Sequence, residues 1–155
     1  MGDLRLRADW VALCLFLVRA DCTGMEAATE DQFAKVLQNL SHKEAKIRGQ
    51  AAWALGKSGD SQAVGLLIQT LEDEDGNVRQ WAVLALGNLG EQATKELIRA
   101  LESGNEIVRW QAAAALWQIN DSSAVEPLIM ALFNRSNETR YWAAISLGQM
   151  AIPGP

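Results

Sequence analysis

Four arginines recur at a nearly fixed spacing, and this period constrains the fold more than any other feature of the chain. Arg48, Arg79, Arg109 and Arg140 are separated by 31, 30 and 31 residues. The segments that begin one residue before them align without gaps, as IRGQAAWALGKSG, VRQWAVLALGNLG, VRWQAAAALWQIN and TRYWAAISLGQMA. A period of this size is typical of solenoids, in which each repeat packs only on its neighbours.

Each repeat contains two segments with helical periodicity. In the second segment, at 100° per residue, the apolar residues fall on one alanine-rich face that allows close helix packing. The first segment ends at a leucine eight residues before the arginine (Leu40, Leu71, Leu101 and Leu132). The chain is therefore predicted to be all-α, an α-solenoid (α-α superhelix) of about three and a half two-helix repeats.

The turns of the repeat carry their own signals. Gly59, Gly90 and Asn120 follow the second segments and are expected to adopt the left-handed conformation that ends helices. The one-residue shortening of the second interval is assigned to the turn at Gly90–Gln92, because turns tolerate changes in length.

The arginines are interpreted as a structural ladder. Each lies within the buried helical face, where an unpaired guanidinium would be costly. The ladder is expected to bridge neighbouring repeats, and the candidate partners stand four residues earlier at the helix start: Glu44, Asp75, Asn105 and Ser136. All but Glu44 are also good N-cap residues.

The helical face opposite the core carries four of the six tryptophans and the only tyrosine. Tryptophan and tyrosine supply much of the binding energy at protein interfaces. This face is therefore predicted to be concave and to bind a protein or peptide, although packing of the rings between repeats is the alternative. The candidate partner-binding residues are Trp53, Trp81, Leu84, Trp110, Gln111, Tyr141, Trp142 and Ile145. Trp117 replaces a glycine of the other repeats and is expected to fill a gap between repeats.

The combination VRxxAAxALGxIG with AVxPLIxAL resembles the HEAT-like repeats of the phycobilisome-lyase type. The resemblance covers about residues 31–151 and is specific for fold but not for function, because the repeated residues are packing residues. The family includes bilin lyases and deoxyhypusine hydroxylase. The resemblance implies His-Glu pairs for the di-iron hydroxylase, but this chain has one histidine, His42, which is followed by Lys43. Di-iron chemistry is excluded on that count.

No catalytic residue, metal site or cofactor is expected. Cys14 lies in an apolar run that disfavours a thiolate, and Cys22 has no histidine partner. The two cysteines and His42 do not make a zinc ligand set. A formal net charge of −5 without a local basic cluster argues against nucleic acid as a partner.

Residues 1–24 differ in character from the repeat domain of residues 25–155. The apolar run Trp10–Val18 is far shorter than the ~20 residues that span a bilayer, so no membrane span is predicted. Three interpretations stay open: an over-extended start before Met25, a signal-like segment, or a helix that caps the stack.

These features favour a cytoplasmic, non-catalytic scaffold that binds a protein or peptide. The alternative is a bilin (phycobiliprotein) lyase or a chromophore-handling subunit, as the resemblance implies. Both ends of the stack look poorly capped, so end-to-end self-association is a further expectation.

Overall fold

The computed structural model describes residues 28–151, and within this range every regular element is helical. Side chains are described from Phe33 onward. The elements are α2 (Ala28–Leu40), α3 (Ala45–Ser58), α4 (Ala63–Thr70), α5 (Gly76–Leu89), α6 (Glu91–Ala100), α7 (Glu106–Ile119), the short 3₁₀ helix η1 (Ser122–Ala124), α8 (Val125–Ala131) and α9 (Asn137–Ala151).

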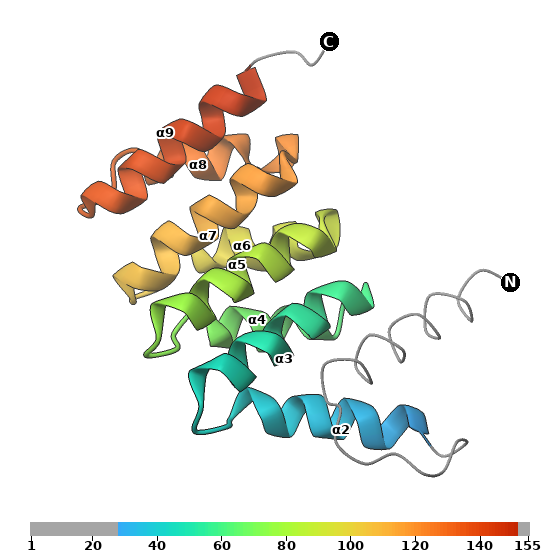
Figure 1. Cartoon of the computed structure of the whole chain (residues 1–155). Coiled ribbons are helices and arrows are strands. Elements are labelled where there is room, and N and C mark those ends of the chain that lie inside the picture. The colour runs from blue at the N-terminus through green and yellow to red at the C-terminus, as the bar shows by residue number, and fades with distance from the viewer. Residues whose placement is uncertain (1–27, 152–155) are drawn as a thin grey trace, which may run out of the picture.

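The helices form two layers. The second helices of the repeats, α3, α5, α7 and α9, pack on one another in order along the stack. The first helices α4, α6 and α8 lie behind them in Figure 1 and make the outer layer, while α2 packs on α3 at the start. This arrangement confirms the predicted α-solenoid, and the described residues make up four helix pairs.

Small residues set the spacing of α3, α5, α7 and α9, which we call the inner layer. A Cβ added to Gly56 on α3 would lie 2.4 Å from the Cα of Ala85 on α5, so the two helices meet backbone to backbone. The predicted buried face forms the core. The leucines seven residues after the first three arginines are fully buried: Leu55, Leu86 and Leu116.

The turns follow the sequence signals, with one difference. Gly59 and Asn120 end their helices in the left-handed conformation, at φ +67° and +56°. Gly90 has φ +63° but ψ −141°, a region that essentially only glycine occupies. It is the single residue between α5 and α6, and this compact turn accounts for the shortened interval.

Helix starts are capped as predicted. The Asp75 side chain accepts from the backbone N–H of Asn77 and Val78, and Asn105 accepts from that of Ile107. The Ser136 hydroxyl accepts from the N–H of Thr139 at 3.2 Å. Glu44 makes no such bond.

The N-terminal segment 1–24 and its three interpretations lie outside the described residues. Among residues 28–151, no helix combines the length and apolarity needed to cross a bilayer.

Candidate functional site

The side chains of the predicted binding surface, along the inner layer, differ in how far they are exposed. We call the following residues the aromatic face: Trp53, Trp81, Leu84, Trp110, Tyr141, Trp142 and Ile145. Tyr141 is 61% exposed, Trp81 41% and Ile145 39%, while the others are half-buried. The structure therefore places accessible aromatic surface on α5 and α9, the second and the last helices of the layer.

Gln111 does not belong to this surface, and the expectation that it binds a partner is wrong. Its side chain is buried, at 1% exposure. Its Nε2 donates to the carbonyl oxygens of Leu71 at 3.1 Å and Ile107 at 3.2 Å. A buried carbonyl gains from a partner, so the amide turns inward and ties α7 to the end of α4.

A cavity of about 530 Å³ opens beside Trp53 and Trp81. The two rings meet edge to face, with centroids 5.5 Å apart. The remaining walls come from the N-terminal turns of α3 and α5: Ala45, Lys46, Gln50, Asp75 and Asn77. The cavity therefore combines an aromatic wall with amide groups that donate and accept hydrogen bonds. Lys57 lies 4.7 Å from the centroid of the Trp53 ring, as a cation over its face.

A second aromatic group lies at the far end of the layer. The Trp142 ring meets Tyr141 at 5.7 Å and Trp117 at 6.5 Å between centroids, both edge to face. Trp117 thus contacts the next repeat as predicted, yet it is still 37% exposed. The sequence analysis left Trp117 out of the predicted binding surface. The signal that could have added it is the substitution itself, a tryptophan at a position that holds glycine in the other repeats.

The rings also contribute to packing, in unequal shares. Trp81 lies against Gly49, where an added Cβ would come within 2.7 Å of the ring. Trp142 is half-buried and packs against the hydrophobic core. Tyr141 is the most exposed ring of the aromatic face. It is the best candidate for a ring that binds a partner without supporting the fold.

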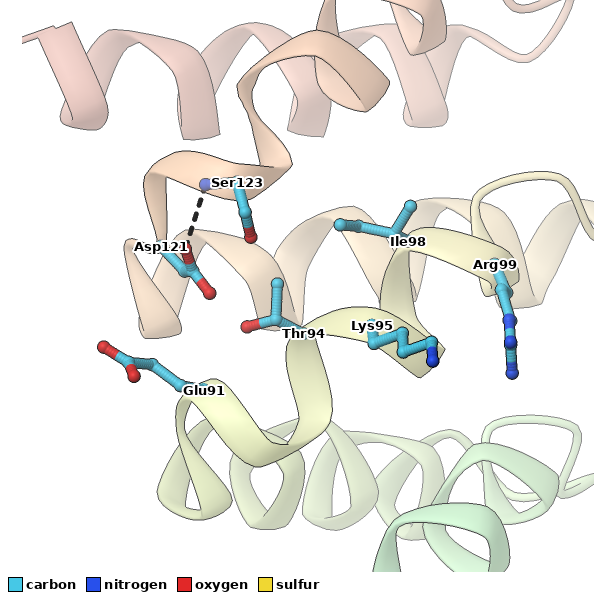
Figure 2. A pocket seen from close by; sticks show the side chains of 7 residues that line it. All are labelled: Glu91, Thr94, Lys95, Ile98, Arg99, Asp121 and Ser123. Atoms are coloured by element: carbon cyan, nitrogen blue, oxygen red, sulfur yellow. Dashed lines mark hydrogen bonds between the residues drawn. The ribbon is translucent and has the colours of Figure 1, made fainter.

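A second cavity, of about 430 Å³, lies in the outer layer between α6 and η1 (Figure 2). Asp121 accepts from the Ser123 N–H at 2.9 Å. This bond, together with the nearby Thr94 and Ser123 hydroxyls, holds the pKa of Asp121 below its ordinary value. Thr94 Oγ1 is buried and, although close to Asp121, makes no hydrogen bond of normal geometry. Arg99, on the rim, pairs with Glu96 at 2.8 Å. The bond to the Ser123 N–H makes Asp121 the cap of η1.

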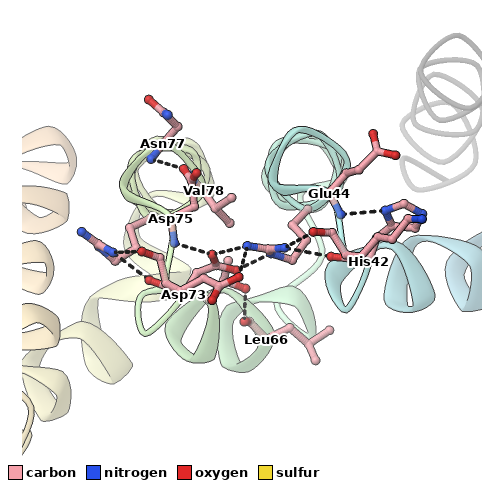
Figure 3. Close-up of polar contacts among 12 residues, drawn as sticks. His42, Glu44, Leu66, Asp73, Asp75, Asn77 and Val78 are labelled. Atoms are coloured by element: carbon pink, nitrogen blue, oxygen red, sulfur yellow. Dashed lines mark hydrogen bonds and ion pairs between the residues drawn. The ribbon is translucent and has the colours of Figure 1, made fainter.

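Arg48, the first arginine of the ladder, is buried and bridges two repeats through Asp73, which Figure 3 labels. Arg48 Nε and Nη2 donate to the two carboxylate oxygens of Asp73 at 2.7 and 2.8 Å. Its Nη1 donates to the carbonyl oxygens of His42 at 2.9 Å and Lys43 at 3.2 Å. Because Asp73 belongs to the second repeat, this bidentate pair fixes the first repeat against the second.

The other three arginines bind only within their own repeat. In each, Nη1 donates to the carbonyl oxygens six and five residues earlier, at 2.7 to 3.1 Å. The predicted partners four residues earlier are wrong, because a helical side chain leans toward the helix N-terminus and reaches past the first turn. Arg140 Nη2 additionally contacts Asn137 Oδ1. The Nε atoms of Arg79 and Arg109 are buried without a partner.

Electrostatics around Asp73 follow from its contacts. Burial raises the pKa of its carboxyl, but hydrogen bonds from Arg48 and from the Asp75 backbone N–H outweigh this effect. The net pKa lies below its ordinary value of about 3.8. Asp73 is therefore charged at neutral pH, and its carboxylate holds the second repeat against the first through Arg48.

Within the described part of the chain, no group of three or more His, Cys, Asp or Glu side chains could hold a metal ion. His42 Nδ1 accepts from the Glu44 N–H at 3.1 Å, so its ring belongs to a turn. Cys14 and Cys22 lie outside the described residues.

Comparison with known proteins identifies the repeats. Residues 33–101 and 94–154 match the family model described as HEAT repeats. A relative named "uncharacterized phycocyanin operon protein Z", from Pseudanabaena tenuis, is 35% identical over 59% of this chain and 46% of its own length. The phycocyanobilin lyase subunit alpha of Nostoc sp. is 38% identical over 62% of this chain and 38% of its own.

A solved structure of similar fold is the complex of CpcE and CpcF of phycocyanin lyase from Nostoc sp. It aligns with a TM-score of 0.52 at 24% identity, over 97% of this chain and 61% of that one. The chain spans less than half the length of the curated relatives it matches. The match over most of the repeat domain decides the family. This chain belongs to the HEAT-repeat family.

Proposed function

We propose that this chain is a non-catalytic, cytoplasmic module that binds a protein segment along the aromatic face. The observation that carries the proposal is the open cavity beside Trp53 and Trp81. A side chain of the partner would anchor there against the rings, with Gln50 and Asn77 as hydrogen-bonding groups. Tyr141 and Ile145 would extend the contact to the last repeat. Exposed aromatic rings next to amide groups are typical of surfaces that bind protein segments.

The names of the relatives support a protein partner and suggest its kind. Three relatives are phycocyanobilin lyase alpha subunits, and the solved neighbour is a complex of two different chains. Subunits by their nature bind other proteins. We therefore propose a phycobiliprotein subunit as the partner of the aromatic face.

The second candidate function is that of a bilin lyase or chromophore-handling subunit. The same relatives favour it by name. A linear tetrapyrrole could stack on the Trp53–Trp81 pair, but its propionate groups would need cations. Lys46 lines the cavity and Lys57 already lies over the Trp53 ring. This limited positive charge supports the protein-binding proposal over chromophore binding.

Incubation with apo-phycocyanin, with and without phycocyanobilin, separates the two candidates. Size-exclusion chromatography reports a complex, and the absorbance of denatured phycocyanin reports covalently attached bilin. The proposal predicts a complex that forms without bilin and no attachment above the uncatalysed level. Covalent attachment accelerated by this chain alone would replace it with the lyase function. The absence of any complex would contradict the proposed partner.

A further inference from the structure

Two large apolar side chains on the outer layer of the last repeat have polar counterparts in the other three repeats. Met130 is 71% exposed and Phe133 is 81% exposed. The positions equivalent to Met130, ten residues before the arginine, are Gln38, Gln69 and Arg99. Those equivalent to Phe133, seven residues before it, are Ser41, Glu72 and Glu102.

The exposure of Met130 and Phe133 is not a consequence of their place in the last repeat. All six equivalent residues are exposed as well, including those of the internal repeats that have a neighbour on each side. The repeat architecture therefore leaves these positions on the surface wherever they occur. Only in α8 and the turn after it are they apolar, and Ile129, 37% exposed, adjoins them.

We infer that this patch, made of Ile129, Met130 and Phe133, is a docking surface for a second copy of this chain. Exposed apolar side chains at positions that are polar in the other repeats, as Met130 and Phe133 are, indicate an interaction site. The inference does not depend on the proposed function, because the aromatic face lies on the helices of the other layer.

The charges beside the patch identify the occupant. Glu126 and Arg135 are both exposed, and neither forms an ion pair among the described residues. Met130 lies about midway between them along the chain. Glu126 lies in the first turn of α8 and Arg135 in the turn after its C-terminal end, so an antiparallel pair of α8 helices brings Glu126 of one copy to the end at which the other copy carries Arg135. A two-fold interface requires such self-complementarity, with the same patch on both partners.

The first test is sedimentation of the whole chain across a concentration series. We expect reversible dimerisation. Met130→Gln with Phe133→Glu installs the residues of the second repeat, Gln69 and Glu72, and should raise the dissociation constant of the dimer at least about tenfold. Its melting should resemble that of the unmodified monomer, since those residues are tolerated at equivalent positions. Tyr141→Ala is the matched control on the other layer and should leave the dimer unchanged.

Charge reversal tests the antiparallel pairing. Glu126→Arg alone and Arg135→Glu alone should each weaken the dimer, whereas both changes in one chain should restore it. A chain that stays monomeric at every concentration would overturn the inference. So would a Met130→Gln, Phe133→Glu variant that dimerises as well as the unmodified chain, or a double reversal that restores nothing.

Discussion

A single position decides how each arginine of the ladder is satisfied. Asp73 stands six residues before Arg79, and its carboxylate accepts the Nε and Nη2 of Arg48 from the previous repeat. The equivalent residue in the third repeat is Ser103, whose hydroxyl accepts the N–H of Asn105 just as Asp73 accepts that of Asp75. Ser103 is too short to reach Arg79, and Arg79 Nε stays buried without a partner.

Ser103→Asp should therefore stabilise the protein. The new carboxylate keeps the turn and supplies Arg79 with the partner that Arg48 already has. We expect a gain of about 1 kcal/mol in the free energy of unfolding, the usual range for a charge-assisted hydrogen bond near the surface. Urea denaturation measures it, with Ser103→Asn as the uncharged control of smaller effect. A loss of stability in Ser103→Asp would show that the arginine does not need this partner.

Asp73 should also impose a pH dependence on stability. Its pKa is lower in the folded protein than in the unfolded chain, so its stabilising effect is complete above about pH 3.8. The effect is lost as the pH falls through the folded-state pKa. Asp73→Asn should lower the melting temperature at neutral pH, and the difference from the unmodified protein should shrink below pH 3.8. A difference that stays constant down to the lowest pH would contradict this role.

At the scale of the element, close packing of α3 on α5 depends on Gly56. Gly56→Ala should destabilise the protein by about 1–3 kcal/mol, because the new Cβ would overlap the backbone of Ala85 and force the helices apart. Gly148 on α9 occupies the same repeat position with nothing within 4 Å. Gly148→Ala should stabilise by about 0.5–1 kcal/mol through helix propensity alone. Equal effects of the two changes in urea denaturation would mean that the packing of α3 on α5 is not limiting.

The helices were predictable from sequence, and individual contacts were not. The 31-residue period and the apolar face locate α3, α5 and α7 because every repeat must bury the same stripe. Gln111 was predicted to be exposed because its position in the repeat also holds Trp81. Its inward turn depends on the Leu71 carbonyl, which lies 40 residues away in sequence. The predicted partners of the arginines were wrong for a similar reason, because the spacing of residues along the sequence does not show in which direction each side chain points.

Over the whole molecule, the two layers carry two different surfaces. The inner layer presents the aromatic face, whose cavity and exposed rings lie at the first two and the last helices. The outer layer carries the patch of Ile129, Met130 and Phe133, and the positions equivalent to Met130 and Phe133 are polar in the other three repeats. Of the two surfaces, only the aromatic face was predicted. A single apolar residue on a helix does not show from sequence whether it is exposed, until it is compared with the same position in the other repeats.

The central claim is that the aromatic face binds a protein while the core holds the fold, and the isolated effect of Tyr141→Ala tests it. Trp142→Ala is a poor probe, since Trp142 packs on the core and its loss should reduce stability. Isothermal titration of apo-phycocyanin into the unmodified chain and into Tyr141→Ala gives the two dissociation constants. The account predicts that binding weakens at least about tenfold with little change in melting temperature. An unchanged dissociation constant in a folded Tyr141→Ala variant would contradict it.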